Sequence, residues 1–362
     1  MDEESTPVTW WDKNEYASAN YGAAEIKDLF GDKNFDFPKA RKLVEDCLRA
    51  SGLSEDGDIV VDYFGGSGTT AHATIELNRS DDTKRKFVLV EMGNHFDEVV
   101  KPRVQKVIYS KDWKDGKPLS REGSSHCVKY IRLESYEDAL NNLAFREDPA
   151  RENALKKHDD FRREYMLKYW LDFETKGSPS LLSVGEFADP MAYMLKIKKP
   201  ASDEYAEKAV DLVETFNWLI GLHVDHIDAP RTFAGKFKRE EDPELPGDQT
   251  TRLILDGKLA EDAKGEWWFR KVEGRVCRTA GDLKHMDRVL VIWRKLTGDL
   301  EKDNLMLDEW FRKYRLSTQD TEFDVIYVNG SNNLPNLKRD DENWKVRLIE
   351  ETFHQRMWDI EG

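Results

Sequence analysis

The chain has 362 residues, of which 35% are charged and 39% hydrophobic, and its formal net charge is -15. This length is enough for two or three domains with a sizeable core. The acidic balance argues against a protein that binds nucleic acid non-specifically by itself, because neutralising phosphates requires a basic surface. We expect neither a membrane span nor a signal peptide, and the three scattered cysteines suit a cytoplasmic protein.

The first part of the chain predicts two short helices. Residues 1–33 form an expected lead-in segment, whose last apolar residues repeat at helical spacing as far as Gly31. A second helix is expected from Pro38, since proline is favoured in the first turn of a helix. Its predicted apolar face consists of Leu43, Val44, Cys47 and Leu48.

Residues 60–78 predict a buried strand, a glycine turn and a helix. The β-formers at 59–63 suit a parallel strand that is covered on both faces. The three glycines within residues 65–68 allow a sharp turn and a close approach of the backbone to a ligand. Thr69 or Thr70 can cap the helix that follows, whose free N–H groups point back into the turn. We therefore expect a nucleotide-type ligand there.

Two acids near this turn predict the charge of the ligand. Residues 66–71 satisfy the loose dinucleotide pattern G-x-G-x-x-G/A, and Glu91 ends the next apolar strand, where a ribose-binding acid belongs. Asp62, however, lies just ahead of the turn, where its carboxylate repels a pyrophosphate and favours a cation. S-adenosylmethionine carries a sulfonium and an ammonium at one end and a ribose at the other. It therefore fits Asp62 and Glu91 better than NAD does.

The rest of the N-terminal part alternates strands with helices. A strand is expected over 87–92, then a helix interrupted near Pro102, a third strand over 126–135 and a helix from residue 136. Residues 34–145 therefore predict a partial Rossmann-like α/β sheet, equivalent to one half of a doubly wound fold.

The second half of the chain predicts a smaller α/β domain. Residues 146–200 are highly charged and predict a helical connector, which is followed by the C-terminal domain over 201–362. That domain should contain an amphipathic helix over 205–222 and a strand–helix–strand unit over 289–330.

These residues resemble a known family. GDIVVDYFGGSGTTAHATIELN followed by FVLVEM is similar to motif I and the acidic motif after it in amino-methylating DNA methyltransferases, and FDFPKARKLVEDCL resembles their motif X. Residues 127–143, 293–311 and 323–334 resemble the methylation (Mod) subunit of type III restriction-modification systems and its large relatives. The resemblance implies methylation of the exocyclic amine of adenine by S-adenosylmethionine, after the base is flipped out of the duplex. The cofactor-binding residues that it implies are Asp62, Phe64, Gly65, Gly66, Ser67, Gly68, Thr69 and Glu91, with Pro38 and Lys39 closing the pocket.

The sequence departs from the family in one respect. The catalytic tetrapeptide (D/N)PP(Y/F) is missing, because the 362 residues hold no Pro-Pro dipeptide, and a target recognition domain ahead of motif X is missing too. We therefore expect no catalytic residue here, and a split subunit or truncated product that is inactive alone. Expected partners are DNA, an upstream methyltransferase half and a restriction subunit, within an oligomer or complex. The strand over 59–64 should also keep one unpaired edge.

Two other functions stay open. The chain could be a non-catalytic assembly subunit of a modification complex, which keeps the cofactor fold for its architecture. An NAD-dependent oxidoreductase is a further alternative, although Asp62 opposes it. A metal site at His223 and His226 is disfavoured, because no third ligand group is obvious.

Overall fold

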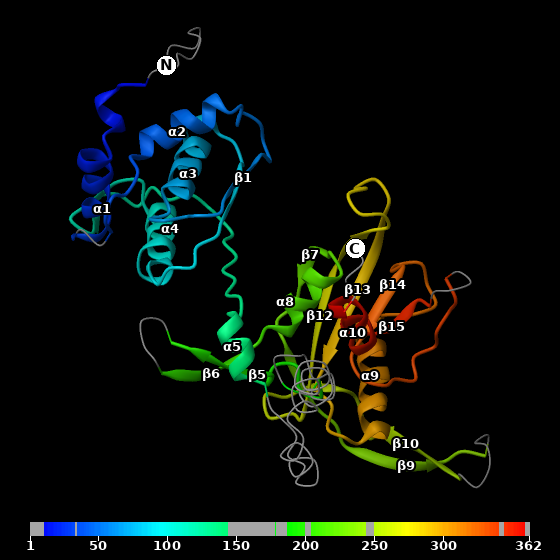
Figure 1. Ribbon diagram of the computed structural model, residues 1–362. Helices are drawn as coiled ribbons and strands as arrows, with labels where there is room; N and C mark the ends of the chain where they lie inside the picture. Colours follow the sequence, from blue (N-terminus) through cyan, green and yellow to red (C-terminus); the bar gives the residue numbers. More distant parts are fainter. Residues whose placement is uncertain are drawn as a thin grey trace, which may run out of the picture. The chain divides into compact units, whose positions relative to one another are not determined.

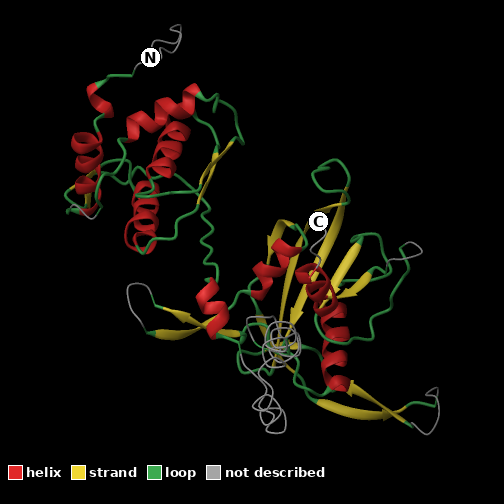
Figure 2. Ribbon diagram, in the orientation of Figure 1, coloured by secondary structure: helices red, strands yellow, loops and turns green. Residues whose placement is uncertain are grey.

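The computed structural model describes residues 11–32, 35–143, 178, 187–199, 204–243, 250–339 and 344–358. The chain divides into two compact units, Met1–Arg132 and Leu133–Gly362. Each unit combines helices with strands, so the expected mixed α/β class is confirmed (Figures 1 and 2). The finer division into a lead-in, a cofactor half and a connector stays a prediction, and most of the connector lies outside the described residues. No described helix is long and apolar enough to cross a membrane.

The described residues of the first unit form four α-helices, three short 3₁₀ or π turns, and two pairs of strands. Its helical elements are η1 (Asn14–Tyr16), η2 (Ser18–Gly22), α1 (Ala23–Phe30), α2 (Arg41–Ala50), α3 (Thr69–Asp81), η3 (Phe96–Val100) and α4 (Lys101–Tyr109). Its strands are β1 (Ile59–Asp62), β2 (Lys86–Leu89), β3 (Trp113–Lys114) and β4 (Lys117–Pro118). The expected interruption near Pro102 is confirmed, since a π turn gives way to α4 at Lys101.

The core of the first unit lies between its helices and one face of the β1–β2 pair. The two strands are parallel, with Val60 opposite Phe87 and Asp62 opposite Leu89. Because side chains alternate along a strand, these four point to the same face, toward the helices. The buried apolar residues of this core come from α1, α3 and α4: Leu29, Ala71, Ile75, Val104 and Val107.

The expectation that β1 is covered on both faces is wrong. Val60 is buried, but Ile59, Val61 and Tyr63 are 58%, 50% and 70% exposed. Among the described residues β1 pairs only with β2, so the expected unpaired edge is present. Helices cover one face of this small sheet, and the alternating residues of the other face meet solvent.

Two further expectations for the first unit are wrong. Neither Thr69 nor Thr70 caps α3, which begins after the left-handed residue Gly68 without a side-chain cap. Residues 126–135 form no strand. Instead, Tyr130 packs its ring 5.6 Å from that of Phe96, and its hydroxyl donates a hydrogen bond to Asp97 at 2.8 Å.

Helix α2 begins later than expected and buries a different face. It starts at Arg41, and its buried residues are Glu45 and Asp46, whereas Cys47 of the predicted apolar face is exposed. The Asp46 carboxylate accepts a hydrogen bond from the Tyr16 hydroxyl at 2.5 Å, and Glu45 pairs with Arg41. Burial of these acids is possible because each has a partner.

The second unit is built on one large sheet and two smaller hairpins. Its helices are α5 (Tyr136–Asn141), α8 (Leu212–Leu219), α9 (Leu300–Tyr314) and α10 (Ile349–Trp358). Its strands are β5 (Met194–Lys198), β6 (Tyr205–Ala209), β7 (His223–Ile227), β8 (Arg231–Ala234), β9 (Phe237–Glu241), β10 (Thr251–Leu255), β11 (Ala260–Glu261), β12 (Trp267–Cys277), β13 (Met286–Arg294), β14 (Val325–Val328) and β15 (Val346–Leu348). The large sheet has the order β11-β8-β12-β13-β14-β15, with β7 also beside β12.

Both faces of the large sheet are covered. Leu290 and Ile292 of β13 pack with α9, whereas Val291 and Trp293 pack with α8 and α10 on the other side (Figure 1). Strands β13, β14 and β15 run parallel, and α9 connects the first two. The expected strand–helix–strand unit is therefore confirmed.

The amphipathic helix expected over 205–222 is only partly present. Its first five residues form β6, which pairs antiparallel with β5. The helix begins after Asp211, whose side chain accepts a hydrogen bond from the Glu214 N–H. This acceptor satisfies a free N–H of the first turn, and it fixes the helix start later than periodicity indicates.

We expect Phe216→Ala to destabilise the second unit by about 3–5 kcal/mol, because Phe216 is fully buried among aromatic rings on α8. Urea unfolding followed by tryptophan fluorescence measures this change. The matched control is Trp218→Ala on the same helix, where the side chain is 66% exposed, and its effect should stay within about 0.5 kcal/mol. Equal losses for the two variants would contradict the packing described for α8.

Candidate functional site

The predicted glycine turn joins β1 to α3 and is folded against the end of β2. Gly66 and Gly68 have φ angles of 54° and 78°, in the left-handed region that glycine adopts without steric cost. The Gly68 N–H donates to the Gly65 carbonyl at 2.7 Å, and the Gly65 N–H donates to the Val90 carbonyl at 3.0 Å. The turn is therefore fixed at the carboxyl ends of two parallel strands.

Asp62 ends β1, and its carboxylate is hydrogen-bonded to both sides of the turn. Oδ1 accepts from the Phe64 N–H at 3.0 Å, and Oδ2 accepts from the Thr70 hydroxyl at 2.6 Å. Thr70 therefore orients the acid rather than capping α3. Each carboxylate oxygen can accept a second hydrogen bond, so Asp62 can still bind a cationic group.

Glu91 follows β2 and contacts the same turn. Its Oε2 accepts from the Gly66 N–H at 2.8 Å and lies 3.3 Å from Nε2 of His95, while Oε1 accepts from the N–H groups of Met92 and Gly93, both at 2.9 Å. Burial acts to raise the pKa of Glu91. The hydrogen bonds from Gly93 and Gly66, together with His95, outweigh burial and hold this pKa below its usual range. An ionised Glu91 thus ties β2 to the glycine turn.

The segment that contains Pro38 and Lys39 lies beside this turn, as expected. Pro38 is buried and Lys39 is exposed. The Thr69 hydroxyl lies 3.4 Å from the Lys39 carbonyl oxygen. On the other side, a Cβ added to Gly22 would lie 2.3 Å from the Pro38 carbonyl, so only glycine fits behind this segment. All ten predicted cofactor residues therefore gather at one end of the β1–β2 pair.

Large apolar side chains surround the same end of the strands. Phe64, Phe37 and Met92 are 88%, 85% and 97% exposed, and the Phe35 ring lies 5.1 Å from that of His95. Of these, only Phe64 was predicted. The sequence FDFP ahead of α2 places two phenylalanines near the turn, but only the fold brings Met92 and His95 to it.

A buried arginine holds the inner side of the turn. Arg103 on α4 is fully buried and donates from Nη1 to the Ser67 hydroxyl at 3.1 Å and to the Thr69 hydroxyl at 3.0 Å. Its Nη2 donates to Glu25 of α1 at 2.6 Å and lies 3.2 Å from Nδ1 of His72. Burial lowers the pKa of Arg103 to about 10, and the Glu25 carboxylate opposes that shift. Arg103 therefore stays charged at neutral pH. Sequence analysis missed it, because a lone arginine in a helix belongs to no motif.

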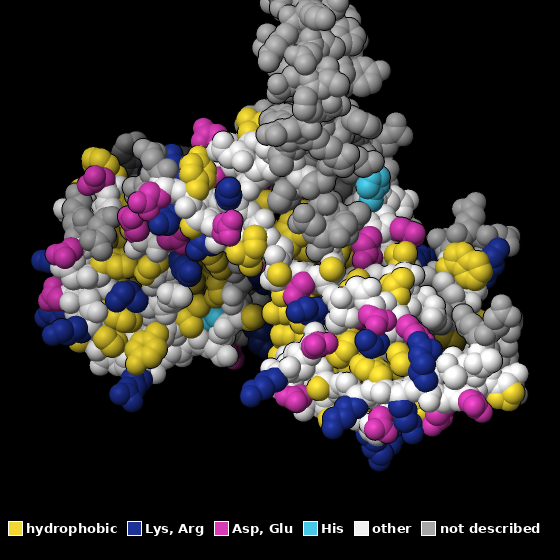
Figure 3. Space-filling view, turned by 90° about the horizontal axis from the view of Figure 1, so that it is seen from below, with side chains coloured by type: hydrophobic (Ala, Val, Ile, Leu, Met, Phe, Trp, Pro, Cys, Tyr) yellow, Lys and Arg dark blue, Asp and Glu magenta, His cyan; other side chains and the backbone are white. Residues whose placement is uncertain are grey.

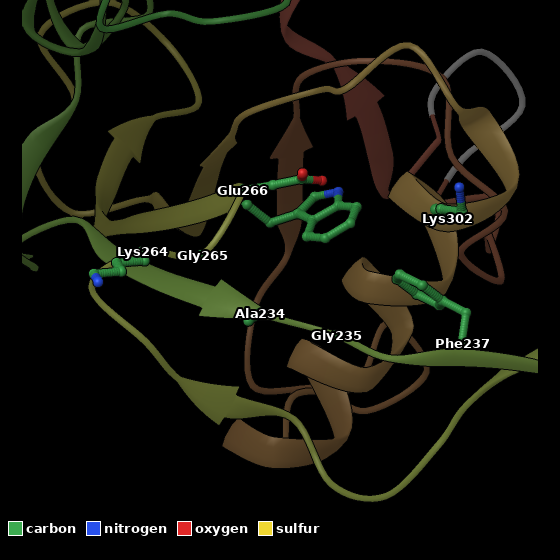
Figure 4. A pocket seen from close by; sticks show the side chains of 8 residues that line it. Ala234, Gly235, Phe237, Lys264, Gly265, Glu266 and Lys302 are labelled. Atoms are coloured by element: carbon green, nitrogen blue, oxygen red, sulfur yellow. The ribbon is translucent and has the colours of Figure 1, made fainter.

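The second unit has a separate cavity of about 410 Å³, shown in Figure 4. Lys264 and Glu266 lie on the turn before β12, Lys302 lies on the first turn of α9, and Phe237 and Trp267 supply aromatic walls. None of the predicted cofactor residues lines it. The Trp267 Nε1–H donates to Asp303 at 2.7 Å, so α9 is fixed at this cavity.

The geometry of the first unit is of a kind that is typical of nucleotide-type sites in α/β proteins. A glycine turn precedes a helix, and an acid stands at the end of each of two parallel strands. The two carboxylates favour a ligand with a cationic group and hydroxyls over one that presents phosphates.

Comparison with known proteins finds several relatives of this chain. Residues 2–102 match the DNA methylase family. The StyLTI Mod subunit of the type III restriction-modification enzyme of Salmonella typhimurium is 37% identical over 116 residues, which are 28% of this chain and 17% of that protein. The EcoPI Mod subunit of Escherichia phage P1 is 37% identical over 94 residues (26% and 14%), and the type II methyltransferase M.KpnI of Klebsiella pneumoniae is 41% identical over 71 residues (20% and 16%). The resemblance to DNA methylases and Mod subunits is therefore confirmed for the N-terminal part, although the chain spans less than a fifth of the length of these curated relatives.

We expect the first unit to lose stability as the pH falls below about 6.5. Burial, and then the charge of Arg103, hold the pKa of His72 well below its ordinary value of 6.5. Below about pH 6.5 the unfolded chain therefore binds a proton that the folded chain does not bind. The free energy of unfolding then falls by up to about 1.4 kcal/mol for each pH unit. Urea unfolding between pH 7.5 and 5.5 measures this slope. His72→Gln should reduce it, whereas the control His126→Gln should not, and an unchanged slope in His72→Gln would contradict the neutral buried imidazole.

Proposed function

We propose that this chain is the cofactor-binding and C-terminal portion of a site-specific adenine DNA methyltransferase of the type III restriction-modification kind. In the proposed reaction, a methyl group passes from S-adenosylmethionine to the exocyclic amine of adenine in duplex DNA. The observation that carries the proposal is the pair Asp62 and Glu91, which bind two points of one glycine turn. The similarity of residues 2–102 to DNA methylases supports the same function.

Each end of the cofactor has a candidate partner. Asp62 lies at the amino end of the turn and would attract the ammonium and sulfonium groups. Glu91 would accept hydrogen bonds from the ribose hydroxyls. Since Glu91 already accepts from three backbone N–H groups, ribose binding requires it to give up at least one of them. Phe64 would cover the cofactor, and Pro38 with Lys39 would close the pocket from the segment ahead of α2.

The acceptor side of the reaction requires other residues. The 362 residues contain no Pro-Pro dipeptide and thus no (D/N)PP(Y/F) tetrapeptide to hold the target amine. We infer that a complementary methyltransferase polypeptide supplies that motif and the DNA-reading surface. A restriction subunit is a further proposed partner, in a cytoplasmic complex.

A second candidate function is that of an assembly subunit without a cofactor. The observation that favours it is the apolar outer face of β1 and β2, where Val61 and Val88 are 50% and 47% exposed. Such a face suits association with another polypeptide, whether or not the turn binds a ligand.

Calorimetric titration with S-adenosylmethionine should detect binding to the 362-residue chain. We expect Asp62→Asn, Asp62→Ala and Glu91→Gln each to weaken it at least about tenfold, or about 1.4 kcal/mol, because each removes a negative charge from the site. Asp62→Asn removes the charge but keeps a side-chain oxygen that can accept the hydrogen bond from Thr70. It therefore tests the effect of the charge while the contact that positions the turn is retained. The control Glu55→Ala should bind like the parent. Absence of binding by the parent chain would contradict the proposal and favour the assembly role.

The same chain should not methylate DNA by itself. Incubated with duplex DNA and a methyl-labelled donor, it should transfer no label, because it lacks the residues that position the acceptor amine. Label in the DNA would contradict this expectation. An intact Mod subunit such as that of EcoPI serves as the positive control for the assay.

A further inference from the structure

His95 stands beside Glu91, the acid to which the proposed function assigns the ribose. It lies just ahead of η3, but its side chain does not cap that turn. Its Nε2 atom is 3.3 Å from Oε2 of Glu91, a distance that suits a hydrogen bond. The orientation does not, because this nitrogen is shielded from solvent and makes no hydrogen bond within the described part of the chain. A shielded nitrogen without a partner is unfavourable, so its presence at this site requires a reason.

Packing holds the imidazole ring of His95 in this place. A Cβ added to Gly93 would lie 2.2 Å from Cε1 and 2.4 Å from Nδ1 of His95, so only glycine leaves room for the ring there. The Phe35 ring lies 5.1 Å from the imidazole at an interplanar angle of 65°. Phe35 also lies 3.9 Å from the position that a Cβ on Gly66 would take. The imidazole is therefore wedged between the segment after β2 and the segment ahead of α2, next to the glycine turn.

The hydrogen bonds of Glu91 leave one acceptor position on the oxygen next to His95. A carboxylate oxygen accepts about two hydrogen bonds. Oε1 accepts from the N–H groups of Met92 and Gly93, so both of its positions are taken. Of the described residues, Gly66 alone donates to Oε2, at 2.8 Å. The acid thus has one position left, and it lies beside a nitrogen that has no partner of its own.

Neither a metal ion nor a broad surface charge explains the pair of Glu91 and His95. No group of three His, Cys, Asp or Glu side chains among the described residues could hold a metal ion, so the pair lacks the further ligands that a metal requires. Over the face of the protein shown in Figure 3, acidic and basic side chains are interspersed, and no surface of one sign marks a ligand there. Single contacts at the turn therefore have to select the ligand.

We propose that His95 is a positioning residue for the ribose-binding acid: its Nε2–H donates to Oε2 of Glu91 when the Gly66 N–H releases that oxygen to a ribose hydroxyl. The inference rests on the proposed function, in which Glu91 has to give up a backbone N–H in order to bind the ribose. A wedged ring offers a donor at a fixed place, so the carboxylate keeps its charge and its orientation while its other partner changes. His95 acts through Glu91 and not on the reacting atoms.

Two ligands, one with the ribose hydroxyls and one without them, separate this role from general support of the fold. The probes are S-adenosylhomocysteine and its analogue that lacks both ribose hydroxyls, and NMR titration of the 362-residue chain measures affinities as weak as millimolar. His95→Leu keeps the bulk but has no donor. It should weaken binding of S-adenosylhomocysteine at least about fivefold and binding of the analogue less than about twofold.

Two further variants serve as controls for the binding test. His95→Gln keeps a donor and should recover at least half of the loss, whereas His126→Leu in the same unit should bind both ligands like the parent. Equal weakening for the two ligands means that His95 only supports the fold of the turn. Unchanged or tighter binding of S-adenosylhomocysteine by His95→Leu means that the imidazole is dispensable or competes with the ribose. Each of these results overturns the proposal.

A measurement without ligand separates this proposal from the proposed function. If the parent chain binds neither probe, the proposed function fails and the ribose role of His95 fails with it. Proton–nitrogen NMR correlation spectra still report which imidazole nitrogen carries the hydrogen, and His95→Leu assigns the signal among the 8 histidines. We expect hydrogen on Nε2, with a nitrogen shift that Glu91→Gln changes and Asp62→Asn does not. Hydrogen on Nδ1 alone, or a shift insensitive to Glu91→Gln, overturns the contact itself.

Discussion

The first unit depends on how a short glycine turn is held in place. Three charged side chains from three elements fix it: Asp62 of β1 accepts from Phe64 and Thr70, Glu91 after β2 accepts from Gly66, and Arg103 of α4 donates to Ser67 and Thr69. Gly66 and Gly68 take left-handed conformations that would strain any other residue. The turn is thus pre-organised, and its two carboxylates are oriented before any ligand arrives.

The same contacts explain why buried charge is tolerated below the turn. Arg103 is fully buried, and so large a desolvation is acceptable only when every donor finds an acceptor. The Glu25 carboxylate neutralises Arg103, and the neutral His72 accepts a hydrogen bond from it. Burial favours this neutral form, because it lowers the pKa of the imidazole. Removing one member of this set would leave a buried charge without its partner. The polar cluster therefore specifies the position of the turn more than it adds net stability.

Sequence analysis predicted those elements whose pattern is local. The β13–α9–β14 unit follows from apolar runs with a helical period between them. Asp62 and Glu91 were predicted to lie at one turn because one ends a strand and the other follows the next strand, and both contact the glycine turn. The same reasoning was wrong where contacts with distant segments of the chain determine the secondary structure. Residues 126–135 have strand composition, but Tyr130 contacts Phe96 and Asp97 of η3 instead. Residues 205–209 were predicted to be helical, but they form β6, which pairs with β5. Contacts such as that of Arg103 with Ser67 join residues 36 positions apart, and no local pattern encodes them.

In the proposed reaction the methyl donor is a cation and the DNA is a polyanion, so the two bind to surfaces of opposite charge. Under the proposed function, the carboxylates at the turn attract a cationic methyl donor, and they belong to a chain with a net charge of -15. Duplex DNA is a polyanion and is attracted by lysine and arginine, so the carboxylates that favour the cofactor repel the substrate. Under the proposed function, basic residues therefore have to bring DNA to a site whose own carboxylates repel it. Asp62 and Glu91 both lie at the glycine turn, so in the proposed reaction a basic surface next to this turn has to outweigh their repulsion of the phosphates.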